Sequence, residues 1–217
     1  SGTVLRMLLP LVALRGKSAS VIGEGTLKGR PNAHLIETLK QRGIPVRGTG
    51  FVHSIPIQFE GGQFQGGEIE IDGSLSSQFV SALLMACPQI SEDSRLKVVG
   101  EKQVSVDYIT MTIQVLKKAG IVIQKKNNRF YLIPGRQRFR GLKSFHVPSD
   151  YGLAAFLLAA GALTESRLTL KGKLTDDFIQ ADARILFLLK KMGVRFRKTS
   201  QSLQLQGPFQ LRGQTFS

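Results

Sequence analysis

The stretch GSLSSQFVSALLMACP, residues 73–88, sets three serines and a glutamine directly before an almost entirely apolar run. Ser76 or Ser77 can cap a helix, because a serine hydroxyl accepts a hydrogen bond from a free N–H group of the first turn. One hydroxyl is enough for that role. A helix start also carries free N–H groups and partial positive charge, which together bind phosphate. The surplus of Ser76, Ser77 and Gln78 leaves both interpretations open, a helix cap and an anion site.

Three other expected helix starts carry residues of the same kinds: Gly2 and Thr3 in SGTVLR, Arg30 in GEGTLKGRP, and Ser105 and Tyr108 in VSVDY. A glycine lets a ligand approach the backbone closely. Glycines with Lys28 and Arg30 at a helix start can cradle an anion. We expect Pro31 at the first helical position, where proline is favoured. The simpler interpretation of each stretch, a cap or a basic turn, also stays open.

The length, composition and net charge of the chain limit the class of protein. The chain has 217 residues, 42% of them hydrophobic, which suits one large domain or two small ones. The net charge of +15 is typical of a nucleic-acid binder, which stays as an alternative. The charge is spread over short groups such as RQRFR and LKK, however, and with no Trp a base-stacking surface is poorly supported. Anionic small molecules or a solvated surface explain the charge equally well. The three histidines lie far apart without clustered carboxylates or cysteines, so we expect no metal site.

Neither a membrane-spanning segment nor a signal peptide is apparent, because no apolar run reaches about 18 residues and the first residues lack a basic leader. The single cysteine, Cys87, suits a reducing compartment. Since the chain does not begin with Met, we expect it to start inside a longer protein.

Three stretches of the chain resemble one another: 19–46, 96–123 and 168–196. Each begins with a short predicted strand ending in glycine and continues into a predicted helix that ends Leu-x-x-x-Gly, which matches a glycine C-cap. An apolar helix precedes each stretch. Because these helices are apolar on all faces, we expect them in the middle of a globule. Predicted strands at 67–73 and 144–149 precede two of them. The pattern indicates an α/β chain of repeated βαβαββ units, about three of them, some incomplete.

Taken together, the motifs resemble those of the 5-enolpyruvylshikimate-3-phosphate synthase family. SGTVLR is similar to the family's N-A-G-T-x-x-R, and GEGTLKGRP to its G-[DE]-x-x-x-x-x-R-P loop. The stretch DGSLSSQFVSALLMACP resembles its D-G-S-x-S-S-Q-F-x-x-A-L-L-M-A-x-P. VSVDYITMT resembles S-x-P-Y-I-x-x-T, with Asp107 where proline is usual. VPSDYGLAAFLLAAGAL resembles the family's G-D-x-S-S-A-x-[YF]-x-L-A-A-A.

The resemblance implies an inside-out αβ barrel of two globules, each built from three βαβαββ units. Residues 1–147 would form most of the first globule, as units 1–72 and 73–147, and residues 148–217 the start of the second. It also implies transfer of the enolpyruvyl group of phosphoenolpyruvate to the 5-hydroxyl of shikimate 3-phosphate, with release of phosphate. It implies neither metal nor organic cofactor, no nucleic-acid or membrane partner, and a monomer in the full-length form. The enzyme would be cytoplasmic, or plastid in a plant or alga.

Residue roles follow from the matched motifs. The resemblance assigns the binding of shikimate 3-phosphate to Thr3, Ser76, Ser77, Gln78, Ser105 and Tyr108. It assigns the binding of phosphoenolpyruvate to Gly2, Arg30 and Gln78.

Other parts of the family's site have no counterpart in the sequence. The family's first Lys, Ser and Arg substrate residues precede residue 1, and its general-base Asp, catalytic Glu and last Lys and Arg follow residue 217. The catalytic residues are therefore unassigned, and we expect the chain alone not to turn over. Two alternatives are a relative of UDP-N-acetylglucosamine enolpyruvyl transferase and a non-catalytic fragment that binds a phosphorylated ligand. The first is disfavoured by Gly25 at its cysteine position and by the S-S-Q-F motif.

Overall fold

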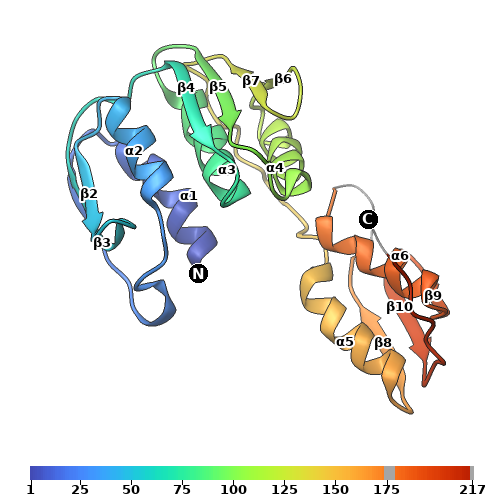
Figure 1. Cartoon of the computed structure of the whole chain (residues 1–217). Coiled ribbons are helices and arrows are strands. Elements are labelled where there is room, and N and C mark those ends of the chain that lie inside the picture. The colour runs from blue at the N-terminus through green and yellow to red at the C-terminus, as the bar shows by residue number, and fades with distance from the viewer. Residues whose placement is uncertain (174–178, 216–217) are drawn as a thin grey trace. The chain divides into compact units, whose positions relative to one another are not determined.

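The computed structural model describes residues 1–173 and 179–215, which form two compact units, Ser1–Leu142 and Lys143–Ser217 (Figure 1). Part of the third repeated stretch, residues 174–178, lies outside the described residues. In the described part, no helix is long and apolar enough to cross a membrane.

The first unit contains four α-helices and seven strands among its described residues. They are α1 (Gly2–Ala13), β1 (Ser18–Val21), α2 (Ala33–Gln41), β2 (Val46–Thr49), β3 (Ser54–Glu60), β4 (Gly67–Asp72), α3 (Ser77–Ala86), β5 (Ser94–Val99), α4 (Val106–Lys118), β6 (Gln124–Lys125) and β7 (Phe130–Ile133). Two short 3-10 turns, η1 (Gly25–Leu27) and η2 (Cys87–Gln89), join them. The second unit holds α5 (Tyr151–Leu163), β8 (Arg167–Lys171), η3 (Ala181–Ala183), α6 (Arg184–Lys191), β9 (Phe196–Lys198) and β10 (Ser202–Gln206).

The strands form three sheets, ordered β1-β3-β2, β4-β5-β7-β6 and β8-β10-β9. In each sheet the last strand of a βαββ run lies between the two strands that precede it: β3, β7 and β10. Only β4 and β5 pair in parallel; the other described pairs are antiparallel. The strands alternate as half-buried strands do, so that in β5 Leu96 and Val98 face the core while Arg95 and Lys97 face outward. The mixed α/β class expected from the sequence is confirmed.

Helix α3 lies in the middle of the first unit, as its apolar sequence predicts. It packs side by side with α1 and against α4 (Figure 1). Its apolar residues from Phe79 to Leu84 are fully buried, and the core extends from them onto both sheets. The rigid, buried body of α3 fixes the position of its first residues, Ser77 and Gln78.

The expectation that an apolar helix is buried on all faces is wrong for α5. One side of this helix packs on β8, β10, η3 and α6, and there Leu158 is 0% exposed. On the other side Leu153 is 71% exposed, Phe156 79% and Leu157 53%. An all-apolar helix is buried only if elements exist to cover every face, and the described part of the second unit supplies them for one.

Two local predictions are also wrong. Pro31 lies before the helix, since α2 begins at Ala33 with Asn32 at its N-cap. The buried Asn32 amide donates to the carbonyl oxygens of Arg30 (2.9 Å) and His53 (3.0 Å), which holds the chain outside the helix up to that point. Residues 144–149 form no strand, and their one backbone hydrogen bond to another described segment joins Ser149 N–H to the Lys173 oxygen at 2.9 Å.

The buried Cys87 gives a test of the core around the end of α3. Its side chain is 0% exposed, and burial raises the pKa of the thiol to about 12. Because the thiolate is the reactive form, we expect the native chain to leave an aromatic disulfide reagent unreacted at pH 8. The urea-unfolded chain should release one equivalent of the reagent's thiolate at once. Rapid reaction of the native chain would contradict the buried position.

Candidate functional site

A pocket of about 400 Å³ opens where α1, α3 and α4 begin. Most of its polar lining comes from the first turns of these three helices, and Ser81 and Thr112 lie one turn further along α3 and α4. Met7, Val104 and Met111 supply apolar parts of the wall. Helix starts present free N–H groups and partial positive charge, so three of them around one pocket favour an anionic ligand. The pocket brings together six of the eight residues predicted from the sequence: Thr3, Ser76, Ser77, Gln78, Ser105 and Tyr108.

The start of α3 is capped by one serine. The Ser76 hydroxyl oxygen accepts a hydrogen bond from the Gln78 N–H group at 3.2 Å, which confirms the predicted cap. Ser77 is helical and lines the pocket, and no described residue forms a hydrogen bond with its hydroxyl. The Ser76 oxygen therefore accepts the capping bond while its O–H proton can still be donated into the pocket, and the Ser77 hydroxyl is available to a ligand.

The side chain of Gln78 is held in one orientation by two residues of α1. Its amide nitrogen donates to Thr3 Oγ1 at 3.0 Å, and its amide oxygen accepts from Arg6 Nη1 at 2.9 Å. With donor and acceptor both fixed, the amide cannot turn around without losing both bonds. The pocket wall is thus ordered before any ligand enters.

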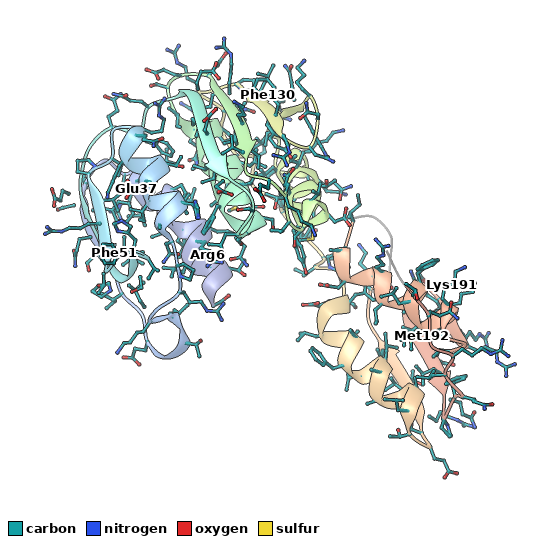
Figure 2. The ribbon with its side chains drawn as sticks, viewed as in Figure 1. Arg6, Glu37, Phe51, Phe130, Lys191 and Met192 are labelled. Carbon is teal, nitrogen blue, oxygen red and sulfur yellow. The ribbon has the colours of Figure 1, made fainter. Side chains whose placement is uncertain are left out.

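Arg6 was not among the residues predicted to form the site, although it is the last residue of the motif SGTVLR. It projects from α1 (Figure 2) and is only 8% exposed. Its Nη2 donates to the Pro31 oxygen at 2.9 Å, and its guanidinium lies 4.9 Å from the centre of the Phe79 ring. The signal in the sequence is a lone arginine within the apolar run of the expected helix.

The charge of Arg6 is buried without a counterion among the described residues. Burial lowers the pKa of its guanidinium, and the nearby positive charge of Arg30 lowers it further. Its Nε atom is buried without a hydrogen-bond acceptor. A buried cation is costly unless a negative group compensates it. An anion bound in the pocket would supply that compensation.

Gly2 and Arg30 are not part of the lining, but they lie next to each other. A Cβ atom added to Gly2 would lie 3.9 Å from Arg30 Nη1, so the bare backbone of Gly2 faces the guanidinium. Arg30 is exposed, and its Nε donates to the Thr26 oxygen at 3.4 Å. The positive charge of Arg30 acts on Arg6, so the two arginines extend one positive region from the loop into the site.

Ser105 and Tyr108 start α4 on the opposite wall. Ser105 is the N-cap residue by position, but its side chain makes no capping hydrogen bond, and its φ of 53° is in the left-handed region. Non-glycine residues hold this conformation at a cost, often at functional positions. The hydroxyl of Ser105 therefore lines the pocket without capping the helix, whereas that of Ser76 does both. Among residues 1–173 and 179–215, no three His, Cys, Asp or Glu side chains gather in a way that could hold a metal ion.

Comparisons with known proteins agree with the geometry. The sequence profile of EPSP synthase (3-phosphoshikimate 1-carboxyvinyltransferase) matches residues 1–216. A 3-phosphoshikimate 1-carboxyvinyltransferase of Methanococcoides burtonii is 35% identical over 95% of this chain and 48% of its own length. That of Methanosarcina acetivorans is 35% identical over 100% of this chain and 50% of its own. The chain spans about half the length of these curated relatives.

Solved structures share the fold. An EPSP synthase of Acinetobacter baumannii superposes with a TM-score of 0.73 at 21% identity, over 100% of this chain and 48% of its own. The enolpyruvyl transferase NikO of Streptomyces tendae gives a TM-score of 0.68 at 20% identity, over 93% of this chain and 46% of its own. With the profile match over nearly every residue, the chain belongs to the EPSP synthase family.

Proposed function

We propose that this chain supplies one wall of the active site of an enzyme that transfers the enolpyruvyl group of phosphoenolpyruvate to the 5-hydroxyl of shikimate 3-phosphate, releasing phosphate. The observation that carries the proposal is the buried, uncompensated Arg6 beside Gln78, at a pocket formed by three helix starts. Both substrates are small phosphorylated acids, which is the class of ligand that such a pocket favours. The names of the curated relatives support the same reaction.

The residues predicted from the sequence divide between the two substrates. The hydroxyls of Thr3, Ser76, Ser77 and Ser105 are suited to the phosphate and hydroxyl groups of shikimate 3-phosphate, and the Tyr108 ring packs against its carbon ring. Gln78 lies between the two substrates. Gly2 and Arg30 hold phosphoenolpyruvate, because a guanidinium can form paired hydrogen bonds with a carboxylate or phosphate next to an unobstructed backbone.

The reaction is an addition followed by an elimination. The 5-hydroxyl oxygen bonds to C2 of phosphoenolpyruvate while a proton adds to C3, which gives a tetrahedral intermediate. Loss of a proton from C3 and of phosphate from C2 then restores the double bond. The residues of this chain orient the two substrates and balance their negative charge, which accelerates a reaction between two bound molecules. No general acid or base is assigned to this chain, and the reaction needs neither metal nor organic cofactor.

The proposed architecture is an inside-out αβ barrel of repeated βαβαββ units: 1–72, 73–147 and a partial unit in 148–217. The shared strand order of the three sheets supports a repeated unit. The exposed apolar side of α5 supports a second globule that is incomplete in this chain. As a member of the shikimate pathway, the complete protein would act as a monomer in the cytoplasm, or in the plastid of a plant or alga.

The test is calorimetric titration of the purified chain with shikimate 3-phosphate. We expect saturable binding that the double variant S76A/Q78A weakens at least about tenfold, since it removes hydrogen bonds to a charged ligand. The matched control is Q89A/S91A, which changes the same residue types at exposed positions outside the pocket. It should leave the dissociation constant within about twofold of the original.

The outcomes separate the candidate functions. We expect binding without phosphate release when phosphoenolpyruvate is added, because the chain spans about half of the relatives' length. Phosphate release at a normal rate would contradict the expectation that this chain carries only part of the active site. Binding of UDP-N-acetylglucosamine in place of shikimate 3-phosphate would instead identify the sister transferase. No saturable binding of either would reject the proposed function.

A further inference from the structure

The outer face of the sheet β8-β10-β9 is strongly cationic. β10 is the middle strand, and its Gln206 pairs with Arg167 of β8 while its Gln204 pairs with Thr169 of β8 and Arg197 of β9. Arg195 directly precedes β9. An open groove of about 450 Å³ runs over this face, and its polar lining consists of Arg167, Thr169, Arg195, Arg197, Gln204 and Gln206. An adjoining hollow joins Arg195 to Lys190 at the end of α6, next to the Lys191 labelled in Figure 2.

The three arginines of this groove lack ion pairs. All are exposed, and none is within 4.0 Å of a carboxylate of the described residues. Glu165 lies two residues before Arg167 but forms no ion pair with it. The groove itself contains no acidic residue among those described.

The outer faces of the other two sheets are different. On β4 and β5, Arg95 bonds to Glu68 and Lys97 to Glu70, each at 2.7 Å. In the β1-β3-β2 sheet, Arg47 lies 3.9 Å from Glu60. These three outward cations are thus paired with carboxylates, in contrast to the arginines of the groove. Like charges close together on one sheet face destabilise it, so the unpaired set on β8-β10-β9 costs stability.

We propose that this groove is a binding site for a small soluble ligand that carries two or more phosphoryl groups. Arg167 and Arg195 flank β10 at two strand spacings, about 10 Å between their backbones, which lets both guanidinium groups reach a ligand lying over Gln206. Guanidinium groups match phosphoryl oxygens by paired hydrogen bonds. Thr169, Gln204 and Gln206 add neutral donors between them. The volume is that of a small-molecule site, and the groove shares no lining residue with the pocket of the first unit.

The experiment titrates the full chain with inorganic tripolyphosphate. We expect saturable binding, with amide shifts in an NMR spectrum centred on Arg167, Arg197 and Gln204. The variant R167Q/R195Q/R197Q should weaken the binding at least about tenfold. The control K102Q/K117Q/K126Q removes the same net charge from exposed positions of the first unit and should weaken it by less than about twofold.

Equal weakening by both triple variants would overturn the proposal, because it would show that binding depends on the net charge of the chain and not on the groove. Shifts confined to the first unit would also overturn it, as would the absence of binding. Association with phosphatidylglycerol vesicles but not with tripolyphosphate would replace the soluble ligand by a membrane headgroup. The arginine variant should melt at the same temperature as the parent or higher, since the like-charge repulsion is gone. This excludes unfolding as the reason for lost binding.

Discussion

Replacing Leu158 with alanine should lower the free energy of unfolding by about 2–5 kcal/mol, whereas the same change at Leu157 should lower it by less than about 1 kcal/mol. The two leucines are neighbours in α5, but Leu158 is 0% exposed and Leu157 is 53% exposed. Truncation of a buried leucine loses burial and leaves a cavity, while truncation of an exposed one does neither. Urea unfolding of the full chain, followed by far-ultraviolet circular dichroism, measures both changes.

A second pair in α1 serves as the control. Leu9 is 0% exposed and its neighbour Leu8 is 45% exposed, so the same contrast is expected in the first unit. If Leu157→Ala cost as much as Leu158→Ala, α5 would be buried on all sides, and the sequence-based expectation would hold after all. If neither change mattered, the small core that joins α5 to β8 and β10 would be contradicted.

The difference between α3 and α5 defines what the sequence can predict. Both helices are apolar on nearly all faces, and this pattern predicts burial for both. Whether burial occurs depends on which other elements are present, and that information lies elsewhere in the chain. The same reason applies to residues 144–149, whose alternation suits a strand but which find no strand partner in the described structure. Predictions that depend only on neighbouring residues are more reliable. The cap at Ser76, for example, follows from residue types within one turn.

Some residues of the candidate site could likewise be predicted from the sequence, and others could not. The polar residues at helix starts were predictable because each start is a local pattern, and the motifs aligned them in order along the chain. Arg6 was missed as a site residue because its importance comes from a partner, Gln78, that lies 72 positions away. The left-handed backbone of Ser105, which frees its hydroxyl from capping, also has no local signature. Contacts between distant segments are what sequence patterns do not encode.

Replacing Arg6 with methionine should weaken binding of shikimate 3-phosphate about 100-fold, because the positive charge beside the pocket is lost and an interaction with a charged group contributes about 1.5–3 kcal/mol. The change also releases the Gln78 amide oxygen from its 2.9 Å bond, so the amide is free to turn. Arg6→Lys keeps the charge but cannot reach Gln78 and the Pro31 oxygen together as the guanidinium does, so we expect an intermediate loss.

The stability of Arg6→Met against urea should stay the same or rise while its affinity for the ligand falls. This contrast distinguishes a functional arginine from a structural one. Methionine fills a similar volume over the Phe79 ring and removes a buried cation whose Nε atom has no acceptor. Such replacements of uncompensated buried charge are often neutral or stabilising. We therefore expect the urea midpoint of Arg6→Met to equal or exceed that of the parent while ligand affinity collapses. Parallel losses of stability and affinity would assign Arg6 to the fold alone, and unchanged affinity would remove it from the site.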